Sequence, residues 1–281
     1  MNIPKRPLAE ELPPAQAPLP AGLLIHPLRV LLALCSCITV LLACYVGTMT
    51  LRFGIVTSPL LTSHHSFFGL VRLFDLDAEA NIPTFFSVLQ LAIAAALLYV
   101  IGRHAHQRTD RFARHWLILG AIFLFLSLDE LAQIHELLGP PVRNFLHTDG
   151  ILYYAWFIPY GILTAVIGVA YIAFLAHLPA RTRWLFIFSG LIYVGGAVGL
   201  EMYAGYLNSR LGHEAIKTSI AYLTEVFVEE GMEMFGIALF IYALLTHIHA
   251  TIGRIRFDFA PNPRRRCAYM GSERSRHAPE A

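Results

Sequence analysis

Six uninterrupted apolar stretches dominate the pattern of hydrophobic and polar positions along the chain. A helix needs roughly 20 apolar residues to cross a hydrocarbon core about 30 Å thick, and each stretch is near or above that length. We therefore predict an all-α polytopic membrane protein, a bundle of six transmembrane helices. The predicted helices cover residues 30–51, 84–102, 116–138, 151–178, 184–207 and 219–246.

Polar segments containing Pro, Arg and Ser flank this apolar region at both ends. They divide the chain into an N-terminal segment, 1–25, a membrane domain, 26–250, and a basic tail, 251–281. Because both ends have little apolar periodicity, we expect them to be disordered. The first apolar stretch is too long for a signal-peptide core, so we expect it to be retained as a helix.

Basic residues gather in alternate connections between the predicted helices. Basic residues lie before the first helix, between the second and third, between the fourth and fifth, and after the sixth. The intervening connections are poorer in Lys and Arg and carry several acidic residues. Since basic connections stay on the cytoplasmic side of a membrane, both termini are predicted to be cytoplasmic.

Composition supports the membrane assignment and narrows the partners. Of the 281 residues, 56% are hydrophobic and only 14% are charged, whereas soluble domains carry about 25% charge. The formal net charge of +2 is the sum of a basic cytoplasmic face and a more acidic outer face. The basic tail is explained by the cytoplasmic face, and no nucleic-acid partner is needed to account for it. The four cysteines show no spacing typical of a disulfide framework or zinc site. Membrane lipid is therefore the partner that the composition predicts.

Ionisable residues interrupt the apolar pattern near one end of three predicted helices. On the last helix the acids recur every four residues and form one stripe. By the predicted orientation, all of them lie in the outer half of the membrane and can converge. The residues are Asp129, Glu130, His135 and Glu136 on the third helix, Glu201 on the fifth, and Glu225, Glu229, Glu230 and Glu233 on the sixth.

These carboxylates have no Lys or Arg partner within the six predicted spans. A charged residue near the bilayer centre costs at least about 2.5–3.5 kcal/mol, so the acids are either protonated, bound to a divalent metal ion or open to a water-filled cavity. We assign Glu130 and Glu136 as candidate general bases. The candidate metal ligands are Asp129, His135, Glu201, Glu225, Glu229, Glu230 and Glu233.

The connection after the first predicted helix contains a second acidic motif. Oxygen-bearing side chains alternate from Asp75 to Asn81, as in the first half of a calcium-binding loop. The motif departs from that loop because Ala80 replaces the turn glycine and Phe86 replaces the bidentate glutamate. We expect it instead to supply Asp77 or Glu79 to the carboxylate cluster, or to cap the second helix.

Three segments together resemble a group of uncharacterised bacterial multipass membrane proteins. They are Phe74–Thr84, Ser127–Glu136 with its Asp-Glu and His-Glu pairs, and Gly199–Glu201. The resemblance covers most of residues 66–246 and implies a bacterial cytoplasmic membrane location. It implies no activity.

Three functions remain open from the residues. The first is a metal-dependent membrane enzyme acting on a lipid or on a small molecule at the outer face. The second is a small transporter of protons or cations, in which the acid pairs Asp129/Glu130 and Glu229/Glu230 titrate. The third is a non-catalytic subunit or sensor that uses the acids to hold a partner. The sequence does not indicate the oligomeric state.

Overall fold

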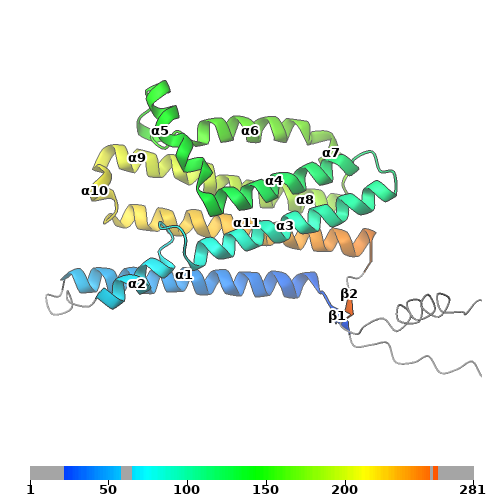
Figure 1. The fold of residues 1–281 in the computed structure, drawn as a ribbon, viewed down its shortest axis with the longest axis horizontal. Coiled ribbons are helices and arrows are strands. Elements are labelled where there is room, and N and C mark those ends of the chain that lie inside the picture. The colour runs from blue at the N-terminus through cyan, green and yellow to red at the C-terminus, as the bar shows by residue number, and fades with distance from the viewer. Residues whose placement is uncertain (1–21, 58–64, 254–255, 259–281) are drawn as a thin grey trace, which may run out of the picture. The chain divides into compact units, whose positions relative to one another are not determined.

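The computed structural model describes residues 22–57, 65–253 and 256–258, nearly all of them as helix (Figure 1). Two short strands, β1 (Gly22–Leu24) and β2 (Arg256–Asp258), pair antiparallel with Leu23 opposite Phe257, and they belong to a unit separate from the helical one. Most of the two ends predicted to be disordered lies outside the described residues.

The helical unit consists of long apolar helices and several short connecting ones (Figure 1). In chain order they are α1 (Pro27–Thr57), α2 (His65–Phe74), α3 (Ile82–Gln107), α4 (Ala113–Ala132), α5 (Ile134–Leu146), the 3-10 turn η1 (Gly150–Leu152), α6 (Phe157–Ala170), α7 (Ile172–His177), α8 (Ala180–Val194), the π segment η2 (Gly195–Leu200), α9 (Glu201–Leu211), α10 (His213–Ile216) and α11 (Ile220–Thr251).

Five helical segments of the described chain are long and apolar enough to cross a membrane: α1, α3, α4, α8 with its continuation to α9, and α11. The fourth predicted span, 151–178, differs from the prediction because it is not one helix. It contains η1 and the shorter helices α6 and α7, which meet at Tyr171. At this break the Tyr171 hydroxyl donates to the backbone oxygen of His115 on α4.

The third predicted span, 116–138, is also interrupted. Helix α4 ends at Ala132 because Gln133 adopts a left-handed conformation with φ 55°, and α5 then starts in a new direction (Figure 1). His135 and Glu136 therefore do not extend the acidic face of α4, as the sequence analysis assumed. They stand on the first turn of a separate helix that carries Pro140 and Pro141 in its interior.

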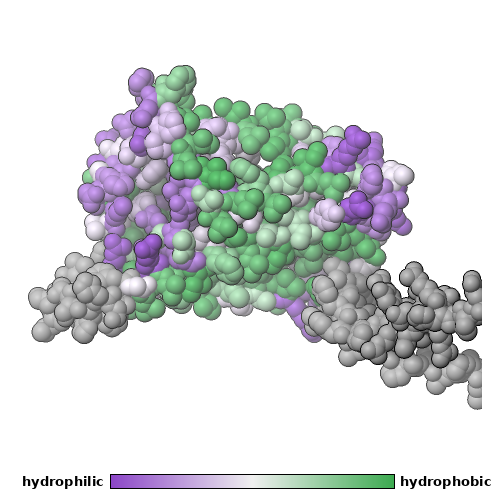
Figure 2. All heavy atoms as spheres, viewed as in Figure 1, coloured by the Kyte–Doolittle hydropathy of each residue, from purple (hydrophilic) through white to green (hydrophobic). Residues whose placement is uncertain are grey.

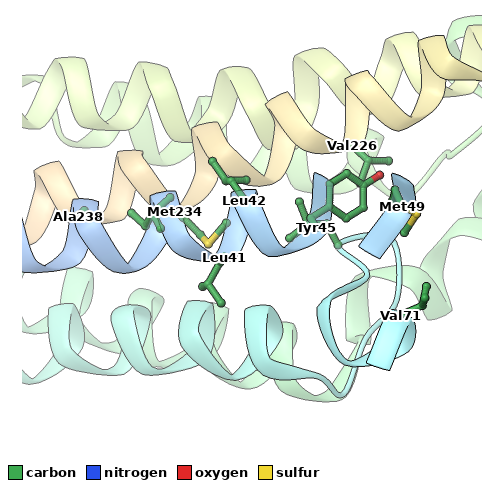
Figure 3. Close-up of a cluster of buried hydrophobic side chains, with 10 residues drawn as sticks. Leu41, Leu42, Tyr45, Met49, Val71, Val226, Met234 and Ala238 are labelled. Carbon is green, nitrogen blue, oxygen red and sulfur yellow. The ribbon is translucent and has the colours of Figure 1, made fainter. Parts of the chain in front are cut away.

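Helix α11 forms the centre of the bundle and buries more of its length than any other membrane-length helix. Its Val226, Met234 and Ala238 pack against Leu42 and Tyr45 of α1 (Figure 3). The outward side of α1 is apolar and exposed, as is the outward side of α6. Figure 2 shows the resulting surface, an apolar belt between two hydrophilic ends. Such a belt is typical of a protein surrounded by lipid.

One end of the bundle carries α5, α9, α10 and the connection from α2 to α3 (Figure 1). We call it the acidic end, because the carboxylates of α4 and α11 described below lie toward it. The connection is ordered by Asn81, whose side chain accepts the Thr84 backbone N–H at 3.0 Å and caps α3. Pro83 follows in the first turn, where its missing N–H leaves no bond unmade.

Candidate functional site

A cavity of about 880 Å³ lies inside the helical unit, between α4, α6, α8, α9 and α11, with α5 and the connection before α3 at its acidic end. We call it the acidic cavity. Nine carboxylate residues of the described chain line it, and they come from the connection and from four different helices. They are Asp77, Glu79, Asp129, Glu130, Glu136, Glu201, Glu229, Glu230 and Glu233.

Eight of the nine site residues assigned from the sequence line this cavity, including His135. The exception is Glu225, which is absent from the cavity wall. Its side chain is only 4% exposed, and neither carboxylate oxygen has a hydrogen-bond partner among the described residues. The stripe on α11 therefore reaches the cavity only from Glu229 onward.

Asp129 holds the break between α4 and α5 together. Its Oδ1 accepts the backbone N–H of His135 at 2.9 Å and the hydroxyl of Tyr160 at 2.8 Å. Its Oδ2 lies 3.1 Å from Nδ1 of the His135 ring. Both oxygens of Asp129 thus have partners within the protein, and the contact with the ring involves Nδ1, not Nε2. A carboxylate on the second nitrogen is the usual way in which a metal-binding histidine is oriented.

His135 lies beside two carboxylates in a group that could hold a metal ion. One ligand atom from each of Glu79, His135 and Glu136 lies within 4.8 Å of the other two. We call these residues the ligand trio. The ligand atoms of a tetrahedral zinc ion at about 2.0–2.2 Å are about 3.3–3.6 Å apart, so the three side chains would have to move closer by up to about 1.5 Å to bind one. Among the described residues, no other three His, Cys, Asp or Glu side chains bring their ligand atoms so close together.

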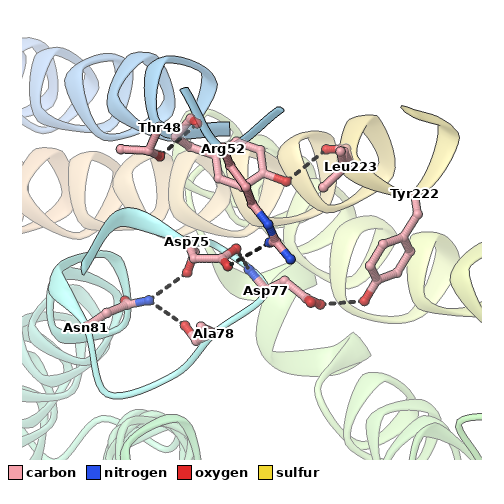
Figure 4. Close-up of polar contacts among 9 residues, drawn as sticks. Thr48, Arg52, Asp75, Asp77, Ala78, Asn81, Tyr222 and Leu223 are labelled. Carbon is pink, nitrogen blue, oxygen red and sulfur yellow. Dashed lines mark hydrogen bonds and ion pairs between the residues drawn. The ribbon is translucent and has the colours of Figure 1, made fainter. Parts of the chain in front are cut away.

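Glu79 was not among the assigned metal ligands, although the acidic motif around it was noted as a contributor. The connection that carries it is braced from several sides (Figure 4). Asp75 pairs with Arg52 of α1 at 3.8 Å, and Asp77 accepts the hydroxyl of Tyr222 on α11. These contacts fold the connection across the acidic end, which sequence spacing alone does not reveal.

The electrostatics of the trio favour a bound cation. Burial and the nearby Glu136 carboxylate raise the pKa of Glu79 to about 7. Burial opposes protonation of His135, but the hydrogen bond and charge of Asp129 outweigh it, so the pKa of His135 lies above its ordinary value. The surrounding carboxylates therefore favour positive charge at this place, either as a proton on His135 or as a bound metal ion, and the two compete for the imidazole.

Two permanently cationic side chains, Arg143 of α5 and Lys217 after α10, also line the cavity. Neither forms an ion pair with a cavity carboxylate within the described part of the chain. Arg143 instead lies over the ring of Tyr153, with Cζ 4.4 Å from its centroid. The cavity thus holds two basic side chains that come from outside the six predicted spans, beyond the residues that the sequence argument considered.

Helices α8 and α9 form one continuous helix that contains the π segment η2 between them. Glu201, the first residue of α9, directly follows η2 and lines the cavity. Segments of this type often occur at functional sites. Within η2, a Cβ at Gly196 would lie 3.0 Å from the Glu229 backbone oxygen and 3.3 Å from Glu233 Cγ, so glycine permits the close approach to α11. The Glu201 carboxylate accepts the indole N–H of Trp156 at 3.1 Å.

The cavity becomes apolar away from the acidic end. Phe240 of α11 stacks on Phe123 of α4 with ring centroids 4.6 Å apart, and it meets Phe186 of α8 at 4.7 Å. Phe174 and Leu175 of α7 continue this lining. One cavity thus combines an ionisable part with an aromatic and aliphatic part.

Apolar helices of membrane-spanning length, an apolar belt and an ionisable interior cavity define an all-helical membrane protein. The chain belongs to the DUF8692 family, a domain of unknown function, which matches residues 38–248. The match covers every residue of the acidic cavity. No curated protein and no solved structure matches the chain.

Proposed function

We propose that this protein is a metal-dependent membrane enzyme acting on a lipid, with a divalent metal ion held by Glu79, His135 and Glu136. The observation that carries the proposal is the closeness of these three ligand atoms, within 4.8 Å, on the wall of a large cavity. Three protein ligands leave a coordination position open, which is typical of catalytic rather than structural metal sites.

The neighbouring residues supply complementary roles. Asp129 holds the His135 ring through Nδ1, which would leave Nε2 available to a metal ion. A divalent ion in this position would supply Lewis-acid activation of a water molecule or of an ester or amide oxygen. Glu130 lines the same cavity and is the candidate general base that accepts a proton from that water. Glu136, a candidate base in the sequence analysis, becomes a ligand.

The shape of the cavity supports a lipid substrate. Its ionisable part and its aromatic part are continuous, so a molecule with a polar head and an apolar chain can contact both. Ligand pockets of about 300–1,000 Å³ enclose most of a molecule of moderate size, and 880 Å³ falls in this range.

Metal content tests the proposal. The full chain, purified in mild detergent and equilibrated with Zn²⁺, Mn²⁺ or Fe²⁺, is expected to retain about one ion per chain after gel filtration. The variant Glu79→Gln should retain much less, since it removes one of three ligands. Glu214→Gln, at an exposed acid that does not line the cavity, should match the wild type. A folded wild-type chain that stays free of all three metals would exclude the enzyme proposed here.

A small cation transporter is the second candidate function. The observation that favours it is the convergence of Glu130 with Glu229, Glu230 and Glu233 in one cavity. The aromatic lining beyond Glu233 argues for a closed pocket instead, because it offers a moving ion few polar contacts. Cation or proton flux into proteoliposomes that is abolished by Glu229→Gln would favour transport over the enzyme.

We further propose that the protein lies in a bacterial cytoplasmic membrane with the acidic end outside. Arg103, Arg108 and Arg114 around the connection from α3 to α4, and Arg181 and Arg183 at the start of α8, support this orientation. A green fluorescent protein fused to the C-terminus should fluoresce, since it folds in the cytoplasm, and alkaline phosphatase fused there should be inactive. The opposite pair of results would reverse the orientation.

A further inference from the structure

We infer that the acidic cavity binds a lipid with a single alkyl chain and a positively charged head, an amine or a quaternary ammonium. The inference rests on the proposed function for the view that this ligand is a substrate. The binding itself is argued from charge and shape, and it does not require the metal ion.

The acidic side chains of the cavity favour a ligand whose head group is positively charged. Glu201, Glu229, Glu230 and Glu233 lie outside the ligand trio, and none of them pairs with a basic side chain in the described part of the chain. Together with Arg143 and Lys217, a divalent ion in the trio would supply four positive charges to a cavity lined by nine carboxyl groups. An ammonium group near Glu229 and Glu233 would compensate part of the remainder, whereas an anionic head would add to the repulsion.

Aromatic side chains beside these acids strengthen the same preference. Trp156 and Tyr160 line the cavity close to Glu201 and Asp129, with which they are hydrogen bonded. Their ring centroids are 5.5 Å apart and their planes are nearly perpendicular at 86°. Aromatic faces next to carboxylates are the usual surroundings of quaternary ammonium ligands, because the ring quadrupole attracts a cation.

The apolar part of the cavity favours a ligand that carries an alkyl chain. On α4 the lining runs from Glu130 back to Leu119, which is about 16 Å along a helix at 1.5 Å per residue. Phe123, Phe186 and Phe240 surround its inner end. We call the apolar part of the cavity the arm; its length suits one alkyl chain, and the volume of 880 Å³ is small for a phospholipid with two.

Helix α6 alone separates this part of the cavity from the outer surface of the bundle. Its Ile162 and Val166 are 63% and 60% exposed, whereas Thr164 and Ile167 line the cavity. The backbone of α6 also approaches α4, α8 and α11 less closely than α3 approaches α4. A lipid chain in the surrounding bilayer is thus separated from the cavity by few packed side chains.

Binding of matched amphiphiles to the full chain in lipid nanodiscs tests the inference. The probes are radiolabelled tetradecyltrimethylammonium and tetradecyl sulfate, with binding to empty nanodiscs subtracted. The cationic probe should bind saturably at one site and at least 10-fold more tightly than the sulfate. The double variant Glu229→Gln/Glu233→Gln should weaken it at least 10-fold, and Glu214→Gln should leave it unchanged. Equal or tighter binding of the sulfate would overturn the inference.

A second pair of variants tests the chain arm and does not alter the acids. A Cβ at Gly190 meets nothing within 4 Å and points to open space in the cavity wall, so Gly190→Leu should partly fill the arm. It should weaken the tetradecyl probe at least 10-fold and leave tetramethylammonium unaffected. Gly161 is equally open but does not line the cavity, so Gly161→Leu is the matched control. Equal effects of the two variants would contradict a chain-binding arm.

The two proposals fail in different measurements on the same samples. Stoichiometric metal without preference for the cationic probe would overturn the substrate class and leave the metal site standing. Selective binding of the cationic probe by a metal-free chain would retain the ligand class and remove the metal-dependent enzyme.

Discussion

Replacement of His135 by alanine is expected to weaken binding of a divalent metal ion by about 100-fold or more. His135 is the one imidazole of the ligand trio, and two carboxylates without it have little selectivity for ions such as Zn²⁺. The measurement is a competition titration of the purified chain against a chelator of known affinity. His213→Ala is the matched control, since His213 also lines the cavity but lies outside the trio, and it should change the affinity less than threefold.

The fold of the variant must be checked, because His135 stands directly after the break between α4 and α5. The backbone N–H of residue 135, which Asp129 accepts, is kept in the alanine variant, so the break should persist. An unchanged helical circular dichroism spectrum together with unchanged metal affinity would show that the ion, if bound, lies elsewhere in the cavity.

Replacement of Asp129 by asparagine is expected to weaken metal binding by about 10–100-fold, the range typical of residues that orient a ligating histidine. The amide oxygen can still accept the His135 backbone N–H, so the cap is preserved. The amide NH₂ would then face Nδ1 at the present 3.1 Å contact and favour the tautomer with the proton on Nε2. In that tautomer Nε2 cannot bind the ion.

Tyr160→Phe separates this orienting effect from a general disturbance of Asp129. It removes the hydroxyl that Asp129 Oδ1 accepts and leaves the contact between Oδ2 and the ring. We expect a change in metal affinity of only a few-fold. If Tyr160→Phe and Asp129→Asn were equally damaging, the tautomer of His135 would not be the cause.

The run length of apolar residues predicts the membrane class and the position of most long helices, because spanning a bilayer imposes a minimum length on a helix. It does not predict where a helix breaks inside a run. The turn at Gln133 depends on Asp129 capping His135, and the break at Tyr171 accompanies a hydrogen bond to a distant helix. The first is a local bond between residues six apart and the second is a tertiary contact, and apolar periodicity contains neither.

The candidate site is predictable to a similar degree. Buried acids at helical spacing have to converge in an apolar bundle, and eight of the nine assigned residues line one cavity. Glu225 shows the limit of that argument, because it is buried without lining the cavity, although its neighbour Val226 does line it. Glu79 shows the opposite case, since only the folded connection brings it within ligand distance of His135.

The most direct test of the metal site is an anomalous difference map from crystals of the full chain equilibrated with Zn²⁺ or Mn²⁺. The proposal predicts one strong peak between Glu79, His135 and Glu136, about 2.0–2.2 Å from His135 Nε2 and from one oxygen of each carboxylate. A map without a peak at the trio, or with the ion held by Glu229 and Glu233 on α11, would contradict it.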